Sequence, residues 1–134
     1  MATRFDHEKL DVYQEAISFV AWADDITQSM TGKCSVKDQL DRASTSVPLN
    51  IAEGNAKRSI RDRCRYLDTA CGSALECAAC LDVIVAKGLL RADDVECGKG
   101  KLQRIVSMLV RLIESTANRV GEERAEYEYE YEYD

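Results

Sequence analysis

Four stretches of the sequence carry apolar residues at helical spacing, and only a few residues connect one stretch to the next. We expect helices over residues 7–30, 35–56 and 59–87, and a fourth from just after Ala92 to about residue 121. Within each stretch the apolar residues recur at steps of three and four, which is the period of one face of an α-helix. Because short connections make successive helices antiparallel neighbours, the sequence predicts an all-α, antiparallel up-down four-helix bundle.

The predicted core stripes are clearest in the second, third and fourth helices, where they follow an a/d pattern. The second helix carries Val36, Leu40, Ala43 and Val47. The third carries Ile60, Cys64, Leu67, Cys71, Ala74, Ala78, Leu81 and Val85. The fourth carries Leu102, Ile105, Leu109 and Leu112. Polar pairs at capping-box spacing, Ser35 with Asp38 and Ser59 with Asp62, mark the starts of the second and third helices.

The first helix differs from the others because it has two apolar stripes. One contains Val12, Ala16, Phe19, Ala23, Ile26 and Met30, and the other contains Leu10, Tyr13, Ile17 and Val20. The single tryptophan, Trp22, falls on the remaining polar face. A helix that is apolar on two sides needs two partners, so we expect Trp22, Tyr13, Ile17 and Val20 to form an oligomer interface. The alternative is a wide core face with a partly exposed tryptophan.

Pro48 falls inside the second expected helix. Proline lacks an N–H and its ring clashes with the carbonyl four residues earlier, so we expect this helix to be kinked at Pro48. Hydroxyl and amide groups nearby, such as those of Ser46 and Asn50, are placed to satisfy the freed carbonyls. One interpretation is that they repair the kink, and the other is that they contact a polar ligand or RNA.

The net charge of -6 comes entirely from the C-terminal end. Residues 122–134 contain seven acids and one arginine, whereas residues 1–121 contain 17 acids and 17 bases. We therefore divide the chain into a four-helix bundle, 1–121, and an acidic Glu/Tyr tail, 122–134. A neutral bundle has no general attraction for nucleic acid or an anionic membrane. Dense acidic runs are usually disordered, and the alternative is that the tail tyrosines dock on a basic surface in a neighbouring subunit.

Neither a targeting segment nor a membrane span is expected. The first ten residues are charged, and no apolar stretch approaches the roughly 20 residues that a membrane helix needs. We expect a cytoplasmic protein with reduced cysteines. Cys77-x-x-Cys80 lacks the second pair of ligands that a zinc site needs, so we expect these thiols to pack in the core. The single histidine, His7, has no orienting partner nearby, so we expect no catalytic residue, metal, cofactor or small-molecule substrate.

The segment from Ser46 to Gly54 carries a distinctive motif, Ser-Val-Pro-Leu-Asn-Ile-Ala-Glu-Gly. With it the chain resembles the bacterial four-helix-bundle proteins named for the intervening sequences of 23S ribosomal RNA genes, over about residues 5–120. The motif positions are Ser46, Pro48, Asn50, Glu53 and Gly54. Weaker matches are Gln39-Leu40, Arg42, Gly72-Ser73-Ala74-Leu75-Glu76, and an opening with Phe5, Leu10 and Tyr13-Gln14.

The resemblance implies a four-helix bundle that assembles into a homopentameric ring. It also implies kinship with the accessory variability determinant proteins of diversity-generating retroelements, which are basic and bind a reverse transcriptase and nucleic acid. This chain departs from those proteins, because its bundle is neutral and its tail is acidic. Most members of the family that it resembles have no established activity.

A basic segment, residues 57–65, contains five bases and one acid. The bases are Lys57, Arg58, Arg61, Arg63 and Arg65. Bases at the start of a helix oppose its dipole, so a partner anion would stabilise them. The interpretations are a solvated surface paired with nearby acids, a contact with a nucleic-acid backbone, and a dock for the acidic tail.

The sequence therefore favours a non-enzymatic, cytoplasmic four-helix-bundle protein that self-assembles, with a pentamer implied by the resemblance. The alternative function is that of a nucleic-acid-binding accessory protein, with RNA or a reverse transcriptase as its partner, that uses the basic segment.

Overall fold

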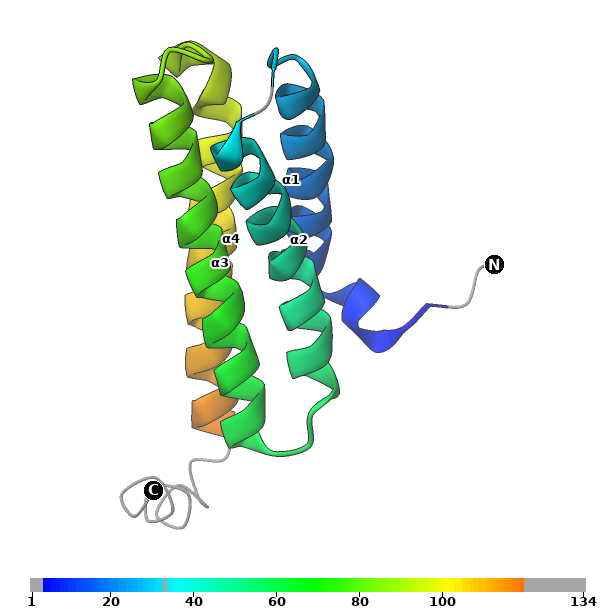
Figure 1. Cartoon of the computed structure of the whole chain (residues 1–134). Helices are drawn as coiled ribbons and strands as arrows, with labels where there is room; N and C mark the ends of the chain where they lie inside the picture. Colours follow the sequence, from blue (N-terminus) through cyan, green and yellow to red (C-terminus); the bar gives the residue numbers. More distant parts are fainter. Residues whose placement is uncertain (1–3, 33, 120–134) are drawn as a thin grey trace.

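The computed structural model describes residues 4–32 and 34–119. These residues form a 3₁₀ helix, η1 (Asp6–Lys9), and four α-helices, which are α1 (Asp11–Gln28), α2 (Ser35–Ala56), α3 (Ile60–Ala86) and α4 (Ala92–Arg119). The described part of the chain contains no strand, and its four α-helices lie side by side with alternating direction (Figure 1). The prediction of an all-α four-helix bundle is confirmed, whereas the tail, 122–134, lies outside the described residues.

The start of α1 and the capping of α2 differ from the prediction. α1 begins at Asp11 rather than His7, because Leu10 has an extended backbone that separates α1 from η1. α2 has Cys34 rather than Ser35 at its N-cap, and no side chain there accepts a capping hydrogen bond. The predicted capping pair of α2 is therefore wrong, and its first N–H groups are not satisfied by a side-chain cap.

The core lies between all four helices. In α1, α2 and α4 it follows the predicted stripes, with Ile26 and Leu112 only half-buried. The largest fully buried aliphatic and aromatic side chains include Phe19, Leu40, Ile51, Leu81, Ile84, Ile105 and Leu109. Each of these removes a large apolar area from water, which is the main favourable term in folding.

The buried face of α3 is turned by about one position from its predicted stripe. Its buried residues are Leu67, Ala70, Ala74, Cys77, Cys80, Leu81 and Ile84. Five predicted members are only half-buried at the edge: Ile60, Cys64, Cys71, Ala78 and Val85. Two neighbouring lines of α3 carry small and aliphatic residues at the same spacing, so periodicity alone did not distinguish them.

The outer face of α3 is apolar as well. Leu75 is 57% exposed and Val83 is 41% exposed. By length and composition α3 is apolar enough to cross a membrane, and 33% of its most apolar window is buried inside the protomer. The expectation that no stretch approaches membrane-helix length is therefore wrong for α3, although core helices of water-soluble proteins meet the same criterion. The rest of the protomer leaves this apolar surface of α3 uncovered.

Pro48 is buried inside α2, which continues past it to Ala56. Its missing N–H deprives the Ser44 carbonyl of its helical partner. The hydroxyls of Ser44 and Thr45 donate to the carbonyl of Asp41, at 3.0 and 2.9 Å, rather than to that carbonyl. The kink at Pro48 stays a prediction.

Candidate functional site

The predicted interface residues of α1 lie on two different flanks of the helix. Ile17 is 44% exposed and lies with Val20 in a groove of about 290 Å³ between α1 and α2. Tyr13 is half-buried, with its ring edge-on to that of His7 at 4.7 Å between centroids. Trp22 lies on the opposite flank, toward α4, so the structure does not bring it together with Ile17 and Val20.

Trp22 packs within its own protomer. Its ring centroid is 5.6 Å from that of Phe19, and its six-membered ring lies over Gly98 of α4. A Cβ atom at position 98 would come within 2.3 Å of two ring carbons. Gly98 therefore provides the space that the ring occupies, a role that sequence reasoning missed. The sequence did contain one signal for this contact. Gly98 interrupts an apolar line of the fourth helix, between Val95 and Leu102, where a larger side chain would be expected.

A second groove, of about 610 Å³, separates α3 from α4 on the other side of the bundle. Leu75, Ala78 and Val106 form its apolar part, and an ion pair between Lys99 and Asp82 lies at one end. Around the bundle α1 contacts α2, α2 contacts α3, α3 contacts α4, and α4 contacts α1. The α1–α2 pair and the α3–α4 pair consequently form opposite sides of the bundle (Figure 1), so the grooves that these pairs line are on opposite faces of the protomer.

Three motif positions hold α2 against α3. The Asn50 amide donates to the carbonyl and the hydroxyl of Ser46, at 2.8 and 2.9 Å, and the Ser46 hydroxyl lies 2.8 Å from that of Ser73 in α3. At Gly54 a Cβ atom would approach the Cβ of Tyr66 to 3.0 Å, so glycine permits the close contact between the helices. Because the half-buried Asn50 side chain already donates hydrogen bonds within α2, it does not need a ligand to satisfy its N–H groups.

The other two motif positions differ in their surroundings. Pro48 is buried, whereas Glu53 is exposed. Glu53 lies with Ser46, Asn50 and the 60%-exposed Leu49 along a shallow groove on the outer side of α2. Glu53 is thus the motif residue whose side chain is available to a partner.

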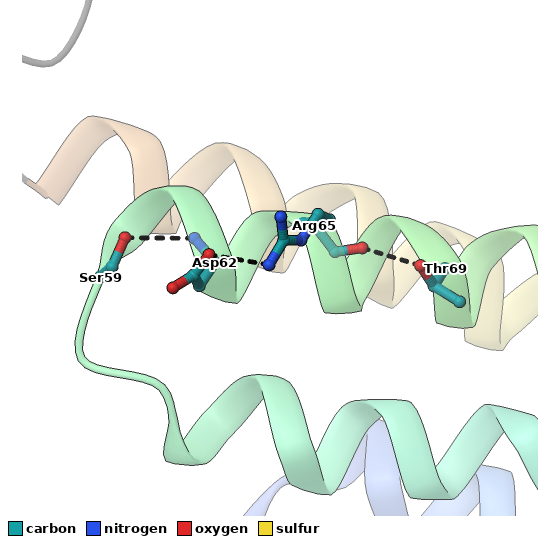
Figure 2. A network of polar contacts seen from close by, with 4 residues as sticks. All are labelled: Ser59, Asp62, Arg65 and Thr69. Carbon is teal, nitrogen blue, oxygen red and sulfur yellow. Dashed lines mark hydrogen bonds and ion pairs between the residues drawn. The ribbon is translucent and has the colours of Figure 1, made fainter. Parts of the chain in front are cut away.

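Part of the basic segment forms a polar line along the first turns of α3. Figure 2 shows Ser59, Asp62, Arg65 and Thr69 following one edge of this helix. The Ser59 hydroxyl accepts from the Asp62 N–H at 3.3 Å, which confirms the predicted cap of α3. The Asp62 carboxylate accepts from Arg65 at 3.0 Å, and the Thr69 hydroxyl donates to the Arg65 carbonyl at 3.0 Å. Because both side chains of this ion pair are well exposed, the pair contributes little to stability.

The remaining bases of the segment point in several directions. The Lys57 ammonium lies 5.1 Å from the ring centroid of Tyr66, a cation–π arrangement. Arg63 is half-buried and donates to the Asn55 side chain at 3.5 Å. Arg58 and Arg61 are exposed. The structure therefore leaves Arg58, Arg61 and Arg65 exposed, whereas Lys57 and Arg63 are half-buried.

The cysteines of the Cys77-x-x-Cys80 pair show the properties of packing residues. All six cysteines of the chain are free thiols, and Cys77 and Cys80 are buried. Burial, followed by the neighbouring Cys80 and Glu76, raises the pKa of Cys77 to about 12. Burial and then Glu76 raise the pKa of Cys80. A raised pKa disfavours the thiolate that metal binding and redox chemistry require, and no cluster of metal-ligating side chains occurs within residues 4–32 and 34–119.

Comparison with known proteins identifies a family and a fold. The model of the 23S rRNA-intervening sequence protein family matches residues 8–111. A crystal structure from Bacteroides thetaiotaomicron VPI-5482, described as a protein with unknown function from the S23 ribosomal protein family, aligns with a TM-score of 0.72. The two chains share 19% identity over 76% of this chain and 97% of that one, so the likeness shows the fold alone. No curated protein matches the sequence.

Proposed function

Because the chain belongs to the 23S rRNA-intervening sequence protein family, we propose that it is a non-enzymatic protein whose defined behaviour is self-assembly into a pentameric ring. The observation that carries this proposal is the amount of apolar surface that one protomer leaves uncovered. Ile17 on α1 and Leu75 and Val83 on α3 are each more than 40% exposed. Large apolar side chains exposed on two faces of a protomer are candidates for protein–protein contacts.

The positions of the two grooves support a ring rather than a two-fold dimer. The α1–α2 groove and the α3–α4 groove differ in their lining residues and lie on opposite faces. A contact between two different patches is heterologous, and repeated copies of it close into a ring when the rotation permits. A cytoplasmic location belongs to the same proposal, since that compartment keeps the six free thiols reduced.

Charge substitutions at the two grooves test the proposal. Ile17→Glu and Leu75→Glu each place a carboxylate on one groove, while Ala117→Glu places one on an exposed position of α4 that lines neither groove. We expect sedimentation velocity to show smaller particles for the first two variants and the wild-type particle for the third. Circular dichroism checks that all three keep their helices. Wild-type assembly by both groove variants would contradict the proposal.

The alternative function is binding of a nucleic-acid backbone through the basic segment. It is supported by the exposure of Arg58, Arg61 and Arg65 on one end of the bundle. Binding of a labelled poly(U) probe should weaken linearly in log affinity with log salt, because phosphate contacts release counterions. Arg58→Glu should weaken binding further, whereas absence of affinity at low salt would remove this alternative.

A further inference from the structure

The end of α4 lies beside the start of α3. The Lys99 side chain pairs with Asp82, and farther along the same groove Val106 and Ser107 of α4 and Ala74 and Leu75 of α3 are all lining residues. In an antiparallel pair with equal rise per residue, this register brings residue 119 level with about residue 62. Figure 1 shows the same juxtaposition of the C-terminal end of α4 with the first turn of α3. The chain therefore leaves α4 at the level of the basic segment.

From this placement we propose that the acidic tail, residues 122–134, docks on the basic segment of its own bundle. The tail has a net charge of -6 and the basic segment has a net charge of +4. Arg61 and Arg65 are exposed one and three helical residues from this level, which is within about 5 Å along the helix axis, and the exposed Arg58 lies just before the first turn of α3. Fifteen residues follow Arg119, and an extended chain of that length reaches roughly 50 Å.

The tail contains the two kinds of side chain that bind an arginine guanidinium, carboxylates and aromatic rings. Glu and Tyr alternate from Glu126 to Tyr133, so an extended backbone would place carboxylates on one side and aromatic rings on the other. Guanidinium groups pair with carboxylates bidentately and also stack on aromatic rings. The ion pair between Arg65 and Asp62 is exposed, so a tail carboxylate can replace Asp62 at little energetic cost.

Because the tail is covalently joined to the bundle, it competes for the basic segment more effectively than a free anion does. A segment joined to its binding surface by a few residues experiences an effective concentration in the millimolar range. Residues 1–121, with the basic segment included, have no net charge, so a free polyanion gains no long-range attraction to the bundle. A docked tail would accordingly cover the surface that the alternative function uses, and RNA binding would require its displacement.

Carbodiimide coupling in the full-length protein tests the proposal directly, since it joins an amine to a carboxylate in contact with it. Arg58→Lys keeps the charge and supplies an exposed amine in the basic segment. Asn118→Lys is the control, because this exposed residue is nearer to the tail in sequence but lies outside the basic segment. Mass spectrometry locates the coupled pairs, and a mixture of ¹⁴N- and ¹⁵N-labelled chains distinguishes coupling within a chain from coupling between copies.

We expect tail glutamates to couple to the amine at position 58 with a yield roughly fivefold above that at position 118, because docking holds the carboxylates beside the first amine. The excess should be within single chains and should vanish in 1 M NaCl, where the Debye length is about 3 Å. Equal yields at the two positions, an excess that persists in 1 M NaCl, or an excess found only between copies would each overturn the proposal.

Discussion

The contact between Trp22 and Gly98 makes a prediction about protein stability. The effect of Gly98→Ala on the free energy of unfolding should change sign when Trp22 is replaced by alanine. Gly98→Ala introduces a Cβ atom that would lie 2.3 Å from the Trp22 ring, so the ring or α4 must move. Overpacking of this kind costs about 1–3 kcal/mol. Replacing glycine by alanine inside a helix gains about 1 kcal/mol in helix propensity. The free energy of unfolding should therefore fall by about 0–2 kcal/mol on balance.

In a Trp22→Ala protein the steric cost disappears and the propensity gain remains. Gly98→Ala should then raise the free energy of unfolding by about 1 kcal/mol, so that the coupling between the two positions is about 1–3 kcal/mol. Urea denaturation of the four proteins, at one fixed protomer concentration, measures this coupling, and the fixed concentration is needed because assembly shifts apparent stability. A Gly98→Ala effect that is the same with and without Trp22 would refute the assigned contact.

The remaining predictions concern three other positions. Gly72→Ala should stabilise the protein by about 1 kcal/mol in urea denaturation, because no atom lies within 4 Å of the new Cβ and only helix propensity changes. Ser59→Ala should lower the free energy of unfolding by about 0.5–2 kcal/mol through loss of the α3 cap, and an unchanged denaturation midpoint would argue against that cap. The pKa of Cys77 is raised from 9.0 to about 12, so between these pH values the unfolded chain loses a proton that the folded chain keeps. Stability should then fall as pH rises above 9, by up to about 1.4 kcal/mol per pH unit for this thiol, and Cys77→Ala should reduce that slope in denaturation at pH 9–11.

Local signals in the sequence were sufficient to predict the helices. The ends of α2 and α3 follow from Ser59, Gly88 and the limits of the apolar periodicity, and all of these act within a few residues of the chain. The capping pair predicted at Ser35 is wrong because the N-cap is Cys34, one residue earlier. A single-residue shift of this kind is within the ambiguity of helix ends.

Features that depend on how helices face one another could not be predicted. The buried line of α3 was misassigned because Cys77 and Cys71 occupy neighbouring lines of equal apolar character, and contact with the other helices decides between them. Trp22 was assigned to a polar face because Gly98, against which its ring packs, lies 76 residues away in sequence. Only the packing of α1 on α4 brings the two residues together. The same holds for the hydrogen bond between Ser46 and Ser73 across α2 and α3.

The central claim is that a single protomer leaves too much apolar surface uncovered to exist alone. Native mass measurement of the purified full-length protein at micromolar concentration tests this claim most directly. We predict a particle with a mass of about five times 15.0 kDa, which is the mass of one chain. A stable particle of 15.0 kDa under the same conditions would contradict it.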